Sequence, residues 1–412
     1  MKNEKLRPLD TIESALLDIK QGKMVIVVDD ENRENEGDFV MAAELVTAPA
    51  INFMITQGKG LVCAPISNEI ANRLELDLQS RKNTDSMGTA FTVTIDAKEN
   101  IHTGISAQDR AHTLQLLSKP TAKASDFTRP GHIFPLIAKN GGVIERPGHT
   151  EAAVDLAKLA GLNPAGVICE IINEDGSMAR LPDLMELADK HDLKIISIDD
   201  LIAYRKIQEN LITQVETIPF PTEFGEFNLY IFRSEILKQE HIAVVKGKID
   251  DLKKDSTLVR LHSECFTGDI FGSYRCDCGD QLALSLKTIE QKGSGILVYL
   301  RQEGRGIGLF NKIKAYQLQD QGTDTVDANL HLGFPADLRD YTMASQIMKY
   351  FEVQSIQLMT NNPQKMEALT NLGHKNIERF PLEIESNPKN EQYLLTKKTR
   401  MGHLLKQNKF NQ

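Results

Sequence analysis

The sequence has no tryptophan and only five cysteines, and no run reaches the roughly 18 apolar residues of a membrane span. The cysteine count is odd and three of the five lie close together, which argues against a disulfide framework and for a reducing compartment. Near the N-terminus, polar residues stand where a signal peptide would need an apolar core. We therefore expect a cytoplasmic protein without a membrane partner.

Positive charge is not in excess either, because 48 Lys and Arg residues stand against 57 Asp and Glu residues, for a net charge of −9. This balance disfavours a nucleic-acid partner, which usually requires a basic surface. Any phosphate must then be bound by a local group of residues. The chain has 412 residues, 41% of them hydrophobic and 25% charged, which is ordinary for two globular domains.

Strand and helix patterns alternate along the chain. After an opening amphipathic helix capped by Asp10, the first half shows strand patterns at 24–28, 60–63, 91–95 and 166–170 and helix patterns at 150–160, 183–191 and 199–211. The second half shows strand patterns at 227–232, 242–245, 257–261 and 295–300 and a helix pattern at 280–291. We predict an α/β (α+β) protein with two mixed α/β domains, each a sheet covered by helices.

The two patterned halves are separated by the stretch ITQVETIPFPTEFGEF, in which Pro219 and Pro221 break any helix. We place the boundary near 204–215 and divide the chain into domains 1–205 and 206–412. No internal repeat relates the two halves.

Cys265, Cys276 and Cys278 lie within fourteen residues, in the segment HSECFTGDIFGSYRCDCGD. Three thiols without a fourth cysteine or histidine at a conventional offset suit a zinc ion with one position open for a nucleophilic water. Ordinary buried cysteines, or a closed structural site completed by a distant residue, are the alternatives. The spacing C-x₁₀-C-x-C differs from that of zinc base deaminases, and residues 304–308 lack the dinucleotide-binding G-x-G-x-x-G spacing.

The first half contains an acidic segment, DDENRENEGD, at residues 29–38. If the segment is extended, the carboxylates of Glu34, Glu36 and Asp38 share one face and suit Mg²⁺, while Arg33 can hold a phosphate. A solvated charged loop is the alternative.

Two similar motifs follow, Arg129-Pro130-Gly131-His132 and Arg146-Pro147-Gly148-His149-Thr150. The second precedes a predicted helix, and a helix start with Arg146 and Thr150 is a natural phosphate seat. Lone histidines are more often packed or exposed than functional, but two in such similar settings favour function. Glu170 ends an apolar strand and is either a base or a core acid satisfied by hydrogen bonds.

These segments, together with GTAFTVTID, TGISAQDRA and PAGVICEIINEDGSMA, resemble 3,4-dihydroxy-2-butanone-4-phosphate synthase over about residues 8–205. The resemblance implies conversion of ribulose 5-phosphate to dihydroxybutanone phosphate and formate. It makes Glu34 and His149 ligands of Mg²⁺ or Mn²⁺, and His132 and Glu170 essential to catalysis. The implied sugar-phosphate site comprises Arg33, Glu34, Asp38, Arg146, Pro147, Gly148, His149, Thr150 and Glu170. One departure is Lys59, where the family usually has arginine.

The second half, with VRLHSECFTGDIFGSYRCDCGDQL, LVYLRQEGRGIGLFNKIKAYQLQDQGTDTVDAN, LGFPADLRDY, LMTNNPQKMEAL and YLLTKKTRMGHLL, is similar to GTP cyclohydrolase II over about residues 220–405. The resemblance implies opening of the guanine imidazole ring of GTP, with loss of formate and pyrophosphate. Zinc at Cys265, Cys276 and Cys278 would activate the attacking water. The implied GTP contacts are Arg260, Leu261, His262, Ser263, Glu264, Gln281, Glu303, Gly304, Arg305, Thr325, Thr360 and Lys365.

The same resemblance makes Asp337 the proton acceptor and lets Tyr316 assist near the metal. It also assigns Arg339 as a nucleophile toward the α-phosphate, although a guanidinium more naturally neutralises phosphate charge. We expect a bifunctional riboflavin-biosynthesis enzyme that acts on small molecules, with Mg²⁺ accompanying GTP and with a homodimer as its assembly. The alternative is a chain in which one half is a degenerate scaffold.

Overall fold

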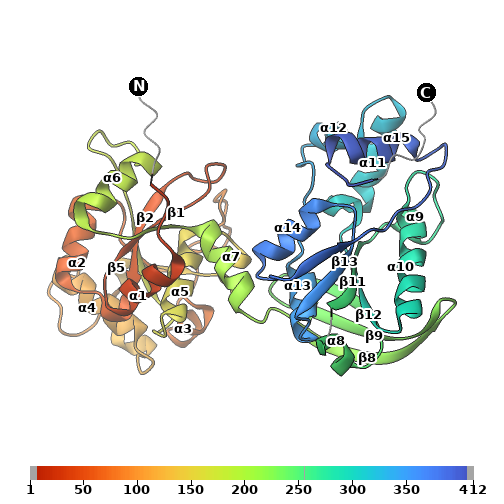
Figure 1. The fold of residues 1–412 in the computed structure, drawn as a ribbon. Helices are drawn as coiled ribbons and strands as arrows, with labels where there is room; N and C mark the ends of the chain where they lie inside the picture. The colour runs from red at the N-terminus through yellow and green to blue at the C-terminus, as the bar shows by residue number, and fades with distance from the viewer. Residues whose placement is uncertain (1–6, 255, 406–412) are drawn as a thin grey trace. The chain divides into compact units, whose positions relative to one another are not determined.

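The computed structural model describes residues 7–254 and 256–405, and the chain divides into two compact units between Gln208 and Glu209 (Figure 1). Each unit is built on one seven-stranded mixed sheet with helices packed against it, which confirms the predicted α/β class. Within the described ranges, no helix combines the length and the apolar character that a membrane span requires.

The first sheet has the strand order β4-β5-β3-β6-β2-β1-β7. Its strands are β1 (Val25–Val28), β2 (Gly37–Ala42), β3 (Cys63–Ile66), β4 (Ile95–Ala97), β5 (Phe127–Ile137), β6 (Gly166–Glu170) and β7 (Ile195–Ser197). Its helices are α1 (Ile12–Lys20), α2 (Ala48–Phe53), α3 (Asn68–Arg73), α4 (Ala107–Ser118), α5 (His149–Leu159), α6 (Leu181–His191) and α7 (Ile198–Gln208). The pairs β1–β7 and β3–β5 are parallel and the other pairs are antiparallel.

Alternate residues of the central strands enter two different cores, so both faces of the first sheet are covered. In β1, Ile26 belongs to one hydrophobic cluster, whereas Val25 and Val27 belong to the other. Helices α2, α3, α4 and α6 contribute to the first cluster, and α1, α5 and α7 to the second. This period of two is what a strand buried on both faces requires.

Two predicted strands of the first unit are misplaced. The expected strand at 60–63 begins only at Cys63, and the expected strand at 91–95 begins only at Ile95. Residues before each strand form isolated bridges instead, such as Lys59 with Ile171 and Phe91 with Leu136. At Gly60 a Cβ would lie 2.5 Å from the carbonyl oxygen of Glu170, so the backbone there crosses its neighbour too closely for a regular ladder.

The second sheet has the strand order β14-β13-β11-β12-β10-β9-β8. Its strands are β8 (Thr213–Thr222), β9 (Gly225–Ser234), β10 (Gln239–Lys246), β11 (Ser256–Ser263), β12 (Gly295–Leu300), β13 (Ser355–Met359) and β14 (Ile377–Phe380). Its helices are α8 (Ile249–Lys254), α9 (Phe266–Asp269), α10 (Cys278–Lys292), α11 (Gly308–Asp320), α12 (Thr325–His331), α13 (Thr342–Tyr350), α14 (Pro363–Asn371) and α15 (Glu391–Arg400).

Strands β11 to β14 of the second sheet are mutually parallel, whereas β8, β9, β10 and β12 pair antiparallel. Helices α13 and α14 pack on one face and α10 packs on the other. Parallel strands place their carboxyl ends at one edge, where ligands bind in open α/β sheets. The chain leaves β11, β12 and β13 at this edge just before the segments that carry Cys265, Glu303 and Thr360.

Strand β8 was not predicted, because Pro219 and Pro221 were expected only to break a helix. They do exclude a helix, but both residues pair with β9, opposite Asn228 and Glu226. Proline is tolerated there because β8 is the edge strand, so its missing N–H removes no bond to a second neighbour.

Candidate functional sites

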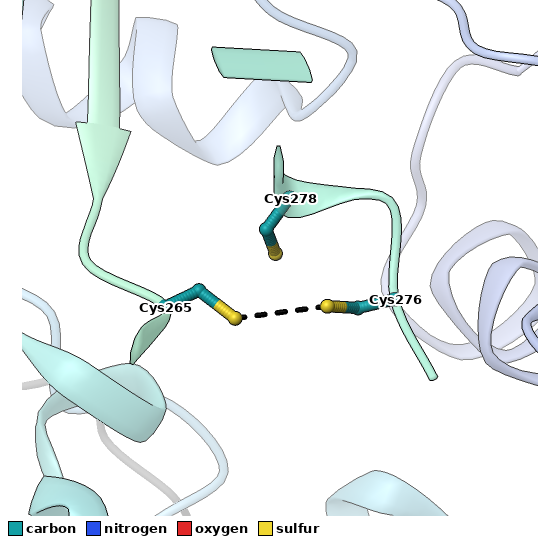
Figure 2. Close-up of side chains that lie close together, drawn as sticks. All are labelled: Cys265, Cys276 and Cys278. Carbon is teal, nitrogen blue, oxygen red and sulfur yellow. Dashed lines mark hydrogen bonds between the residues drawn. The ribbon is translucent and has the colours of Figure 1, made fainter. Parts of the chain in front are cut away.

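The three clustered cysteines of the second unit converge on one point (Figure 2). The sulfur atoms of Cys265, Cys276 and Cys278 all lie within 4.8 Å of one another, and those of Cys265 and Cys276 are 3.6 Å apart. A Cβ at Gly268 would lie 3.0 Å from the sulfur of Cys276, so glycine leaves the thiols the room they occupy. Three soft donors in this arrangement fit a zinc ion.

Lys312 on α11 connects the thiols to a carboxylate. Its Nζ donates to Cys265 Sγ at 3.1 Å and to Glu303 Oε1 at 2.8 Å. Hydrogen bonds from Cys276 and Cys278, together with the charge of Lys312, hold the pKa of Cys265 far below its usual range. Lys312 was not predicted from the sequence, although it lies one helical turn before Tyr316 on the same face of α11.

The loop that carries Cys265 is held by two buried acids. Asp269 accepts the backbone N–H of Cys265 at 3.0 Å and contacts His262 Nε2 at 3.0 Å. Glu303 accepts the N–H of Phe266 at 2.6 Å. These bonds fix the first thiol relative to the ends of β11 and β12. Asp269 was not predicted from the sequence.

A cavity opens beside the thiols. Most of the residues predicted to contact GTP or to assist the reaction line it, namely Arg260, His262, Ser263, Glu264, Gln281, Glu303, Gly304, Arg305, Tyr316, Arg339, Thr360 and Lys365. Leu261 lies in the core instead, and its carbonyl oxygen accepts Lys365 Nζ at 2.7 Å. Thr325 begins α12, but its side chain lies outside the described part of the structure.

Asp337 is not among the residues that line the cavity, but it contacts Arg339, which is, with Nε of the arginine 2.8 Å from one carboxylate oxygen. Burial would raise the pKa of Asp337, but the hydrogen bond and charge of Arg339 lower it overall. The partners also raise the pKa of Arg339 despite its burial. The pair is therefore a carboxylate and a guanidinium, both ionised, and the arginine retains its positive charge.

A chain of polar contacts joins the cavity to the thiol loop. Arg260 Nη2 donates to Gln281 Oε1 at 2.6 Å, and Gln281 Nε2 donates to Asp277 Oδ2 at 2.6 Å. Asp277 lies between Cys276 and Cys278 in the sequence. The sequence motifs indicated Arg260 and Gln281, but gave no role to Asp277.

In the first unit, Asp29, Glu34 and His149 bring one possible ligand atom each within 4.8 Å of the others. His149 Nε2 faces the carbonyl oxygen of Val27 at 3.1 Å, and its Nδ1 lies 3.9 Å from Glu34 Oε2. Because Nε2–H donates to the carbonyl, Nδ1 keeps a free lone pair. Burial lowers the pKa of His149, which favours the neutral ring that a metal ligand needs. Hard oxygen donors beside it fit Mg²⁺ or Mn²⁺.

The extended segment on which the predicted shared face of Glu34, Glu36 and Asp38 depends is not formed. Glu34 ends a turn, and Asn35 has a left-handed backbone with φ of 54°, so the strand begins only at Gly37. Asp29, which the sequence did not single out, lies near Glu34 instead, because Arg33 Nη1 bridges the two carboxylates at 2.7 Å and 2.5 Å.

Two guanidinium groups meet at the start of α5. A Cβ at Gly148 would lie 2.4 Å from Arg146 Nη1 and 3.1 Å from Arg33 Nη2, so the glycine keeps this space open. Arg146 is oriented by Glu151, whose carboxylate accepts it at 2.6 Å. Pro147 precedes the cap and Thr150 is buried in the first turn. Helix N–H groups and two arginines together suit a phosphate.

Asp38 and Glu170 lie directly opposite each other in the β2–β6 pair. Burial, followed by the nearby charges of Glu170 and Glu34, raises the pKa of Asp38 well above its ordinary value. Glu170 Oε2 accepts the N–H of Leu61 at 2.8 Å. A carboxyl whose pKa is raised, beside a second carboxyl, can exchange protons with a bound sugar.

His132 stands apart from the other predicted residues of this site. It lies on β5, and its Nδ1 donates to Asp96 Oδ2 at 2.7 Å. Among the described contacts, none joins His132 to Glu34, His149 or Glu170. Cys63 pairs with both Phe134 and Ile168, so strand β3 separates the strands of His132 and Glu170, about 10 Å apart by strand spacing. Asp96 was not predicted from the sequence.

Each half of the chain matches a known protein family. Residues 13–204 match the 3,4-dihydroxy-2-butanone 4-phosphate synthase family, and residues 213–381 match the GTP cyclohydrolase II family. The riboflavin biosynthesis protein RibBA of Bacillus mycoides is 58% identical over 96% of this chain and 98% of the relative. The RibBA protein of Bacillus cytotoxicus is 56% identical with the same coverage.

Among solved structures, RibBX of A. baumannii, described as a two domain 3,4-dihydroxy-2-butanone 4-phosphate synthase, is 38% identical with a TM-score of 0.67. The match covers 91% of this chain and 100% of RibBX. Along the chain, the synthase match precedes the cyclohydrolase match. The chain therefore belongs to the RibBA family of bifunctional riboflavin biosynthesis enzymes, in which a 3,4-dihydroxy-2-butanone 4-phosphate synthase is joined to a GTP cyclohydrolase II.

Proposed function

We propose that residues 1–205 convert D-ribulose 5-phosphate to L-3,4-dihydroxy-2-butanone 4-phosphate and formate. Residues 206–412 convert GTP to 2,5-diamino-6-ribosylamino-4(3H)-pyrimidinone 5′-phosphate, formate and pyrophosphate. The observation that carries the second assignment is a cavity with three thiols in its wall and seven Lys or Arg side chains around it, against two glutamates. Such a lining favours a polyanion beside a metal.

In the first half, Arg33, Arg146 and the N-terminus of α5 bind the sugar phosphate. Glu34 and His149, with Asp29 as a further candidate, hold Mg²⁺ or Mn²⁺, which would polarise carbonyl and hydroxyl oxygens of the sugar. The raised pKa of Asp38 beside Glu170 supports a proton-transfer role for these two carboxyls.

His132 is the further catalytic group of the first half, oriented by Asp96. The proposed assembly is a homodimer in which each synthase site takes residues from both copies. This assembly is part of the proposal.

In the second half, Cys265, Cys276 and Cys278 hold Zn²⁺, which would supply a Lewis acid for the activation of water. The cations of the cavity bind the triphosphate, together with Mg²⁺ on GTP. Arg339 neutralises phosphate charge, because its contact with Asp337 keeps it protonated. Asp337 accepts a proton, and Tyr316, whose hydroxyl lies 3.3 Å from Thr267 Oγ1 beside the thiols, assists there.

The test follows formate release from ribulose 5-phosphate with Mg²⁺, and from GTP with Zn²⁺ and Mg²⁺, in parallel. The intact chain is compared with Glu34→Ala and Cys276→Ser. We expect Glu34→Ala to abolish only the first activity and Cys276→Ser only the second. Equal loss of both activities in both variants contradicts independent sites.

A chain with one silent half is the second candidate, because RibBX is described only as a two domain synthase and a fold does not guarantee activity. Both ligand groups assembled in this chain disfavour it. Formate from only one substrate in the intact chain would establish it.

A further inference from the structure

The C-terminal segment, residues 387–405, lies beyond residue 381, where the match to the cyclohydrolase family ends. It contains helix α15, and four of its residues line the same cavity as the thiols: Tyr393, Lys397, Met401 and His403. None of these residues was assigned a role above. The segment thus forms part of the wall of the proposed GTP site.

Several contacts hold this segment over the cavity. Arg400 forms a bidentate pair with Asp327 of α12, with N–O distances of 2.9 Å and 3.1 Å. The N–H of Leu404 donates to the carbonyl oxygen of Asn361 at 2.8 Å, and Arg379 donates to the carbonyl oxygen of Leu404 at 2.7 Å. The segment is therefore attached at both α12 and the end of β13.

Lys397 is attached directly to the thiol loop. Its Nζ donates to Asp277 Oδ1 at 2.7 Å, and Asp277 is the residue between the second and third thiols. The side chains of the pair are 12% and 3% exposed, so water screens the contact little. An ammonium group has three N–H donors, and Asp277 uses one of them, which leaves donors for a ligand in the cavity.

Lys397 also belongs to a group of cations that outnumber their acidic partners, because Lys397 pairs with Asp277 and Arg339 with Asp337, whereas the described ion pairs include none for Lys365. Burial, followed by the charges of Arg260, Arg339 and Lys397, lowers the pKa of Lys365 well below its ordinary value. A nearby Nη1 of Arg305 is buried with no hydrogen-bond partner among the described residues. Clustered cations with unused donors are a strained arrangement in a buried site, and an anion with several oxygens would relieve it.

We propose that Lys397 is a further GTP-binding residue that contacts the phosphate chain, and that Asp277 fixes its position relative to the thiols. This inference rests on the proposed cyclohydrolase function. It makes the C-terminal segment a part of the substrate site, so that the phosphate end of GTP and the ring to be opened are positioned by one connected network.

The test measures the affinity of the full chain for two ligands, guanosine and the GTP analogue with a methylene group between the α- and β-phosphates. The variants are Lys397→Ala and Lys397→Arg, and the matched control is Lys398→Ala, whose side chain is not among those that line the cavity. We expect Lys397→Ala to weaken binding of the analogue by about tenfold or more, which corresponds to about 1.4 kcal/mol, because a charge-assisted hydrogen bond to the phosphate chain is lost. Guanosine affinity should change less than about twofold.

Zinc content and thermal unfolding are measured on the same samples. Lys397→Arg should retain most of the affinity for the analogue, and Lys398→Ala should match the intact chain. Unchanged affinity of Lys397→Ala for the analogue overturns the inference. Equal losses for guanosine and the analogue, or a loss of zinc, also overturn it, because Lys397 would then only support the fold.

The proposed function can fail separately. If the intact chain releases formate from GTP while Lys397→Ala binds the analogue normally, only the inference is wrong. If the intact chain neither binds the analogue nor releases formate from GTP, the cyclohydrolase assignment fails and the inference fails with it.

Discussion

Lys312 and Glu303 form a buried ion pair at 2.8 Å, and the same ammonium group contacts the sulfur of Cys265 at 3.1 Å. Their side chains are 10% and 8% exposed. The pair links α11 to the segment after β12 and places one positive charge against the thiol group. Its removal should therefore affect both folding and metal binding.

Lys312→Ala should lower the free energy of unfolding by about 3–5 kcal/mol, because it leaves the buried carboxylate of Glu303 unpaired. Zinc affinity and cyclohydrolase activity should also fall, since the thiolates lose a neighbouring cation. Urea unfolding and zinc titration check this. Lys314→Ala, at an exposed position of the same helix, should change neither quantity. Wild-type stability and zinc affinity in Lys312→Ala would contradict the expectation.

Gly268→Ala should reduce zinc binding without changing the backbone conformation. The added Cβ would lie 3.0 Å from Cys276 Sγ and 3.1 Å from Cys265 Sγ, so the sulfur atoms must move apart. We expect less zinc per chain and at least about tenfold lower cyclohydrolase activity, corresponding to about 1.4 kcal/mol. Elemental analysis and formate release from GTP measure these effects, and the synthase activity is the internal control. Full zinc occupancy would show that the thiols tolerate the methyl group.

Asp96→Asn should lower synthase activity by about tenfold or more, as expected for the partner that orients a catalytic histidine. The amide can still hold the ring of His132, but it lacks the negative charge of the carboxylate that contacts Nδ1 at 2.7 Å. Formate release from ribulose 5-phosphate is measured, with cyclohydrolase activity unchanged as the control. A synthase rate equal to that of the intact chain would remove His132–Asp96 from the mechanism.

His241 on β10 predicts a pH dependence of stability. Burial, followed by the charge of Arg301, lowers the pKa of His241 to about 4, and its Nδ1 accepts the N–H of Arg301 at 2.9 Å. Because the folded pKa is depressed, the stabilisation is present above the unfolded value of about 6.5 and is lost as pH falls toward 4. The loss is about 3 kcal/mol across this window.

The corresponding measurement compares His241→Gln with the intact chain by urea unfolding between about pH 7 and pH 4. The variant lacks the titrating ring, so its stability should fall less steeply than that of the intact chain. His331→Gln, at an exposed position, should follow the intact chain. Parallel curves for His241→Gln and the intact chain would exclude His241 as the source of the slope.

The sequence pattern predicted those strands whose position depends on a short run of apolar residues. The apolar runs at 166–170 and 295–300 became β6 and β12 with those bounds, because each is a short buried strand. The motif spacing also indicated the three thiols, which lie within 14 residues of chain. In contrast, Asp96, Lys312 and Lys397 meet their partners across 36, 47 and 120 residues. Such partners are set by sheet register and helix packing, which no local pattern contains.

The acidic segment shows the same limit at short range. Its composition indicated a metal site, but its expected shape was wrong, because the left-handed residue Asn35 turns the chain before β2. As a result Asp29 approaches Glu34, whereas Asp38 lies in the sheet opposite Glu170. The sequence indicated which types of residue form the metal site, but which carboxylates lie together depends on the backbone conformation.

The prolines of β8 protect the second sheet from pairing with strands of other molecules. Alternate residues of a strand direct their N–H groups to the same side, so Pro219 and Pro221 both remove donors from the side that does not face β9. A strand of another molecule that paired with this edge would lack two hydrogen-bond donors. Proline on an edge strand is a known protection against aggregation through edge-to-edge pairing. Replacing both prolines would not alter the catalytic groups, but it would let the edge strand β8 pair with strands of other chains.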